Sequence, residues 1–174
     1  MWIAKIVLKH DCILGNRCEK FKVILQSLDL NEREEKENIL TSSMHMLIGE
    51  KKNITIFFKD LKKDKRLVHA ELNGNTLFLI DKAKKKPVSK FMKNRIFTIK
   101  PVIIDLHGYE HWEISSYKKE DLMKFICEVK PLMDEFELLS IKNTNLQNIY
   151  FPKLMPDLTD LQKFALELAV KEGY

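Results

Sequence analysis

The sequence predicts an α+β protein in which antiparallel strands are covered by a few helices. Three observations lead to this prediction. Runs of alternating apolar and polar residues recur along the chain, as half-buried strands require. Only a few segments show the three-to-four-residue spacing of apolar side chains that marks an amphipathic helix. Finally, Asn73-Gly74 lies between two alternating runs, and this pair is the strongest short-range signal of a β-hairpin.

The first half, residues 1–81, is predicted to contain five strands and one helix. Asn53 can cap the helix, and Ile54, Phe57 and Leu61 follow at helical spacing. The charged segment 31–38 is predicted to be a solvated loop or a helical turn, and residues 10–18, with their Gly15-Asn16 turn, are predicted to form a loop. The predicted strands cover residues 1–9, 21–30, 39–49, 67–72 and 75–80.

The second half, residues 95–143, is predicted to follow a linker over residues 82–94, where a charge run contains a proline. It reads as a hairpin of residues 95–106 and 110–116, then a helix from residue 118, then a strand over residues 135–141. Pro131 marks the end of the helix. This order is typical of ferredoxin-like and small-molecule-binding regulatory domains. We therefore expect two ferredoxin-like strand-helix-strand halves with antiparallel sheets, then a connector over residues 144–157 and a C-terminal helix.

The composition is that of an ordinary globular protein, with 45% hydrophobic and 32% charged residues among 174. A net charge of +5 permits an anionic partner such as nucleic acid without establishing one. Three cysteines do not make a disulfide framework, and the chain shows neither a secretory signal nor an apolar run of about 20 residues. These features predict a reduced, cytoplasmic protein that is not in a membrane.

The last segment, residues 158–174, is predicted to be a well-capped helix. Thr159 and Gln162 can form a reciprocal capping box, and Gly173 suits a left-handed C-cap. An apolar stripe runs along the helix at Leu161, Phe164 and Leu168. One interpretation is a helix that packs on its own domain.

A second interpretation comes from a resemblance carried by seven residues of this segment. The pattern resembles the first helix of the helix-turn-helix in the bacterio-opsin activator family of archaeal transcription regulators. In that family an N-terminal α+β domain senses or oligomerises, and a later helix reads DNA. The turn and the recognition helix would follow Tyr174, so the resemblance implies a truncated helix-turn-helix domain. The residues are Leu158, Thr159, Gln162, Leu166, Ala169, Gly173 and Tyr174.

The resemblance implies that the chain is the N-terminal sensing and dimerisation region of an archaeal DNA-binding transcription regulator. Its partners would be DNA, bound through a C-terminal domain mostly outside this chain, a second copy of the chain, and a small-molecule effector. An alternative is a stand-alone small-molecule-binding or interaction protein of ferredoxin-like fold.

A further alternative is a metal or thiol redox sensor built on His10, Cys12 and Cys18. His10 and Cys12 would point to one face of a continued strand, and Cys18 could fold back towards them, which makes a nitrogen and sulfur set that suits zinc. The alternative is a purely structural role, with two small buried cysteines and a hydrogen-bonded histidine. Candidates for a fourth ligand are His45, His107, His111 and Cys127.

Catalytic motifs are absent from the sequence. The five glycines are not clustered into a phosphate-binding loop, and neither a nucleophile elbow nor a zinc-protease motif occurs. The carboxylates crowd into residues 32–37, which are expected to face solvent. We therefore predict that the protein is not an enzyme.

Overall fold

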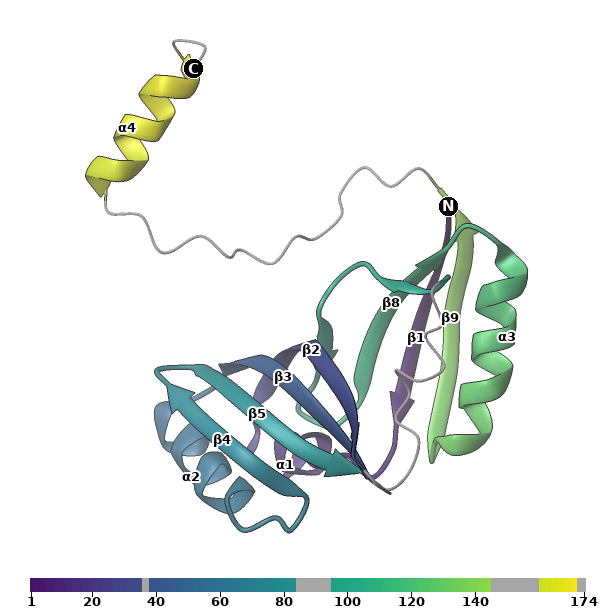
Figure 1. Ribbon diagram of the computed structural model, residues 1–174, viewed down its shortest axis with the longest axis horizontal. Helices are drawn as coiled ribbons and strands as arrows, with labels where there is room; N and C mark the ends of the chain where they lie inside the picture. The colour runs from purple at the N-terminus through teal and green to yellow at the C-terminus, as the bar shows by residue number, and fades with distance from the viewer. Residues whose placement is uncertain (36–37, 84–94, 145–159, 172–174) are drawn as a thin grey trace.

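The computed structural model describes residues 1–35, 38–83, 95–144 and 160–171, and the described residues up to 144 form one nine-stranded sheet with helices at its two ends (Figure 1). The elements in chain order are β1 (Trp2–Lys9), α1 (Gly15–Phe21), β2 (Ile24–Glu35), β3 (Asn38–Ile48), α2 (Lys51–Leu61), β4 (Leu67–Asn73), β5 (Thr76–Ala83), β6 (Phe97–Thr98), β7 (Val102–Ile104), β8 (Glu110–Ser116), α3 (Lys119–Val129), the 3-10 turn η2 (Lys130–Leu132), β9 (Glu135–Asn143) and α4 (Asp160–Lys171).

The sheet is antiparallel throughout, with strand order β4-β5-β3-β2-β7-β8-β1-β9, and β6 pairs with β8 beside β7. The prediction of an α+β fold with antiparallel strands is thus confirmed. The two predicted halves share a single sheet. Strand β1 lies between β8 and β9, where Trp2 faces both Ser116 and Asn143, so the first strand of the chain completes the sheet of the last part.

Both hydrophobic cores lie on one face of this sheet. Residues directly opposite each other on antiparallel strands point to the same face, and Leu25, Ile104, Glu110 and Leu8 form such a row across four strands. At one end α1 and α2 cover this face, and at the other end α3 covers it (Figure 1). Between the two sets of helices, the described residues leave the middle of this face uncovered, as a cleft. The main core residues are Val23, Leu25, Leu47, Phe57, Leu61 and Leu77 under α1 and α2, and Ala4, Ile6, Leu8, Ile114, Leu122 and Phe125 under α3.

Part of the opposite face of the sheet, on β3, β5 and β7, is apolar and exposed. Met46 and Ile103 lie in one row on either side of Gln26, and Ile48 and Phe78 share their face. Their exposed fractions are 53% for Met46, 41% for Ile103, 45% for Ile48 and 43% for Phe78. Exposed apolar patches of this kind commonly mark interaction surfaces.

Local structure agrees with the sequence prediction in the hairpins and in two helices. The Asn73-Gly74 turn joins β4 and β5, with Gly74 at a φ of 58°. The predicted helices correspond to α2 and α3, and Pro131 lies in the 3-10 turn that follows α3. Helix α2 begins at Lys51 after Glu50, so Asn53 is not its cap. Strand β5 runs to Ala83, which places the first two residues of the predicted linker in a strand.

Two local predictions were wrong. Residues 15–21 form helix α1 in place of the predicted turn, because Cys18 packs into the core although most of the helix is polar. Residues 31–35 are predicted to be part of a loop, but they extend β2. Pairing with β3 supports this extension, in which Glu32 faces Thr41 and Glu34 faces Ile39. Backbone pairing of this kind outweighs the low strand propensity of charged residues.

Helix α4 lies within the segment that carries the resemblance. Leu161, Phe164 and Leu168 are exposed on it, and Gln162 is exposed as well. Leu158, Thr159, Gly173 and Tyr174 lie outside the described residues, as do most of the predicted linker and the predicted connector. Of the helices in the described parts of the chain, none combines the length and the apolar character needed to cross a membrane.

Candidate functional site

A cleft of about 770 Å³ occupies the open middle of the helix-bearing face. Its walls are the loop between β1 and α1 on one side and η2 with Met133 on the other. Its floor is formed by β2, β3, β5, β7 and β8. Sites for small molecules usually have volumes of about 300–1,000 Å³, so this cleft is large enough for a metabolite.

One end of the floor is rich in carboxylates. Asp29 on β2 lies opposite Ser43, while Thr41 lies opposite both Glu32 and Asp81. Strand alternation alone would send Asp29 and Glu32 to different faces. The register shift between Asp29 and Asn31 is a β-bulge, which adds one residue and turns both carboxylates towards the cleft.

Two of these carboxylates, Asp29 and Asp81, have a raised pKa. Burial raises the pKa of Asp29 to about 6, and the charges of Glu32, Glu110 and Asp81 add to the effect, although solvent reaches this side chain from the cleft. Burial also raises the pKa of Asp81 to about 6, and the opposing charge of Arg66 reduces the rise. Near neutral pH both groups are therefore mostly ionised at a cost that a bound cation would relieve.

A histidine and a serine lie between the carboxylates and the rest of the floor. Ser43 Oγ and His45 Nε2 are 2.7 Å apart, and His45 is only 2% exposed. Burial lowers the pKa of His45 to about 4, so the imidazole is neutral at physiological pH. Among the described residues its Nδ1 has no hydrogen-bond partner. Neutral His45 and Ser43 make this part of the floor polar but uncharged.

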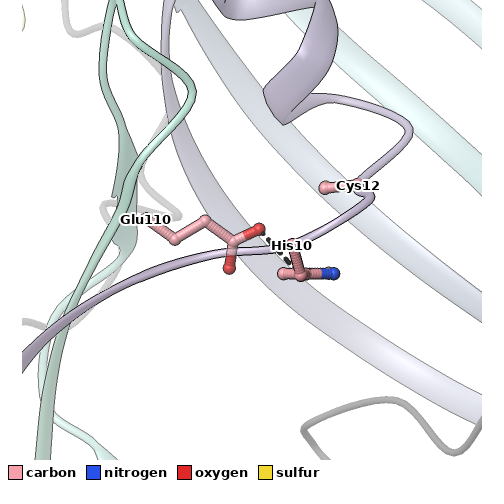
Figure 2. Close-up of side chains that lie close together, drawn as sticks. All are labelled: His10, Cys12 and Glu110. Atoms are coloured by element: carbon pink, nitrogen blue, oxygen red, sulfur yellow. Dashed lines mark hydrogen bonds and ion pairs between the residues drawn. The ribbon is translucent and has the colours of Figure 1, made fainter. Parts of the chain in front are cut away.

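At the other end of the floor, three potential metal ligands lie close together (Figure 2). His10 follows the end of β1, Cys12 lies in the loop before α1, and Glu110 begins β8. Their ligand atoms all lie within 4.8 Å of one another. Figure 2 shows His10 and Glu110 directed at each other, with His10 Nε2 3.1 Å from Glu110 Oε1. The cluster could therefore hold a metal ion.

Glu110 is the centre of this group. It is 6% exposed, and Trp112 Nε1 donates a hydrogen bond of 3.0 Å to its second oxygen. Burial would raise the pKa of Glu110, but the hydrogen bond and charge of His10 and the hydrogen bond of Trp112 outweigh it and hold this pKa below its usual value. Burial would lower the pKa of His10, and Glu110 reverses this effect and raises it.

The structure brings together only two of the three residues predicted from the sequence. Cys18 is fully buried in the core beside α2, and burial raises its pKa to about 12. Burial raises the pKa of Cys12 well above the usual value as well. Neither pKa favours a reactive thiolate, which is what a redox-sensing cysteine needs.

The other candidate ligands serve different partners. His45 bonds Ser43, His111 Nε2 lies 2.9 Å from Asp105 Oδ2, and Cys127 is exposed on α3. His107 donates its backbone N–H to Asp105 Oδ1.

Glu110 was missed by the sequence reasoning. The sequence feature that could have indicated it is its position in the alternation of β8, where it shares a sheet face with the apolar residues Trp112 and Ile114.

Comparison of the chain with protein-family models and with curated proteins gave no match. The resemblance of residues 158–174 to the bacterio-opsin activator regulators therefore stays a prediction.

Proposed function

We propose that this chain is the sensing and dimerisation region of a DNA-binding transcription regulator and that the cleft binds its effector. The cleft carries this proposal. It spans the interval between the two helix-covered ends of one sheet, so a ligand in it would contact β2, β3 and β5 together with β8 and η2. A ligand that binds one arrangement of these ends more tightly than another shifts their populations, which is what a sensor requires.

The effector is expected to be a small organic cation such as a polyamine. Asp29, Glu32 and Asp81 face the floor of the cleft, and two of the basic residues that line it, Arg66 and Lys100, also pair with other carboxylates. Arg66 pairs with Asp64 at 3.0 Å and with Asp11 at 3.3 Å, and Lys100 pairs with Glu113 at 3.0 Å. An ammonium group near Asp29 and Asp81 would favour their ionised forms.

Two surfaces support the dimerisation and DNA-binding parts of the proposal. The exposed apolar face around Met46 and Phe78 suits a second copy of the chain. On α4, Leu161, Phe164 and Leu168 form an exposed stripe, as the first helix of a helix-turn-helix would before its following helices cover it. Chain 1–174 alone should bind DNA weakly and without sequence preference, because base readout needs a recognition element in the groove. Tight, salt-resistant DNA binding by this chain would contradict the proposal.

The effector test is thermal unfolding of the chain with spermidine, with glutarate as an anion of similar size. Spermidine should raise the melting temperature, because a ligand at about 100 times its Kd adds about 2.7 kcal/mol to folding stability. The shift should be small in Asp29→Asn and unchanged in Glu71→Gln, which removes an exposed carboxylate from the opposite face. An equal response to glutarate, or an unchanged response in Asp29→Asn, would rule out the cationic effector.

A stand-alone ligand-binding protein of ferredoxin-like fold is the second candidate, and we infer that arrangement for part of the chain. Read in chain order, β1, α1, β7, β8, α3 and β9 follow the β-α-β-β-α-β order, with residues 24–83 placed between α1 and β7. Spermidine binding without any effect on DNA affinity in the full natural protein would favour this candidate.

A further inference from the structure

We propose that His10, Cys12 and Glu110 bind a divalent transition-metal ion of the zinc type, with one coordination position open to the cleft. This site goes beyond the proposed sensing function and stands whether or not the cleft binds an organic cation.

The distances suit zinc after a small movement. Zinc bonds of about 2.0–2.3 Å place the ligand atoms of a tetrahedral site about 3.3–3.6 Å apart. His10 Nε2 and Glu110 Oε1 are 3.1 Å apart, close to this separation. Because all three ligand atoms lie within 4.8 Å of one another, Cys12 Sγ needs a shift of at most about 1.5 Å relative to that separation. Rotation of its side chain in a loop can supply much of this shift.

The donor set also suits zinc in charge. A thiolate, a carboxylate and a neutral imidazole bring two negative charges, which match the charge of the ion. Coordination requires the Cys12 thiol to lose its proton to solvent.

A neighbouring group orients the carboxylate. Trp112 Nε1 holds Glu110 Oε2, so Oε1 is directed towards His10 and is available as a ligand. Hydrogen bonds of this kind around the ligands commonly fix their orientation and raise metal affinity.

Two glycine backbones bring the ligand-bearing segments together. A Cβ on Gly108 would lie 2.7 Å from the carbonyl oxygen of Gly15, and Gly108 has a φ of 78°. Only residues without a side chain allow the β7–β8 turn to approach the start of α1 this closely. This contact holds the loop that carries Cys12 against the strand that begins at Glu110.

The fourth position would face the cleft, since His10, Cys12 and Glu110 all line it. Three protein ligands and one exchangeable position, held by water or by a cleft ligand, define an open zinc site. A structural zinc site would instead use four protein ligands, and Cys18 is buried elsewhere.

The test is metal binding by the whole chain after treatment with a chelator. Equilibrium dialysis should give about one equivalent of Zn²⁺, and Co²⁺ in its place should give the near-ultraviolet absorption of a cobalt–thiolate bond. Cys12→Ser should abolish this absorption, and His10→Gln should weaken Zn²⁺ binding at least about 10-fold. The matched controls, Cys127→Ser on α3 and His69→Gln on β4, should bind as the parent chain does.

Absence of Zn²⁺ binding, cobalt–thiolate absorption that survives in Cys12→Ser, or equal losses in the two controls would overturn the proposal. If circular dichroism shows that Cys12→Ser does not fold, His10→Gln decides, because the His10 side chain is 30% exposed and lies outside both hydrophobic cores. Asp29→Asn should retain the metal and show only a small response to spermidine, so the two proposals fail independently.

Discussion

Replacing Asp81 by asparagine should stabilise the protein at high pH and leave its stability unchanged at low pH. Burial raises the pKa of this carboxyl from 3.8 to about 6, so the folded state holds its proton more tightly than the unfolded state does. Ionised Asp81 therefore costs stability progressively from about pH 4 to about pH 6 and fully above that range. The substitution removes the charge and this cost.

A rise in the pKa of Asp81 from 3.8 to about 6 corresponds to about 3 kcal/mol. Because solvent partly reaches Asp81 from the cleft, we expect a smaller gain of about 1–2 kcal/mol at about pH 8. Urea unfolding of both chains at about pH 8 and about pH 4 measures the difference, with Glu71→Gln as the control. A gain that is the same at both pH values, or no gain at about pH 8, would refute the reasoning.

Asp81→Asn should also lower the pKa of Asp29, because the charge of Asp81 contributes to raising it. Carboxyl chemical shifts followed through a pH titration would show this coupling. The two ionised carboxylates on the floor of the cleft lower the folding stability of the protein, and a cationic ligand bound beside them would restore it.

Three further predictions concern the turn, the open sheet face and the metal site. Gly108→Ala should lower the free energy of unfolding by about 1–3 kcal/mol, because its φ is positive and the added Cβ would meet the backbone of Gly15. Gly74→Ala should cost less, because its Cβ would meet nothing within 4 Å. Equal losses of the two variants in urea unfolding would contradict this reasoning. Met46→Lys should reduce the dimer fraction measured by light scattering, whereas Met123→Lys, on the exposed side of α3, should leave it unchanged. A monomeric parent chain would rule out the dimer. Trp112→Phe should weaken Zn²⁺ binding about 10- to 100-fold in equilibrium dialysis, because it removes the hydrogen bond to Glu110. Unchanged affinity would mean that this hydrogen bond does not orient the ligand.

The sequence was most informative where structure depends on neighbouring residues. The Asn73-Gly74 turn needs a backbone that glycine adopts readily, and Leu122, Phe125 and Ile126 bury one side of α3 at helical spacing. Such patterns can be recognised without knowledge of the rest of the chain. Helix α1 was missed because it is short and mostly polar, and only tertiary packing shows why Cys18 belongs to a core.

The floor of the cleft could not be predicted in the same way. Its carboxylates come from β2 and β5, and a single β-bulge decides that both Asp29 and Glu32 face it. Glu110 meets His10 only because β1 pairs with β8, and strand pairing between distant segments leaves no local pattern in a single sequence. The spacing of His10 and Cys12 suggested one shared strand face, but β1 ends at Lys9, and these two residues meet Glu110 from the connection between β1 and α1.

The position of β1 has a consequence for how the protein folds during synthesis. This strand is synthesised long before both of its neighbours, β8 and β9, since Trp2 pairs with Ser116 and Asn143. Ala4, Ile6 and Leu8 must wait for α3 to cover them, whereas β2 to β5 with α2 can associate much earlier. Domains whose contacts join distant parts of the chain fold slowly and expose unpaired strand edges for longer. A nascent chain of this protein is therefore expected to need chaperone protection of its N-terminal strand until β9 has emerged.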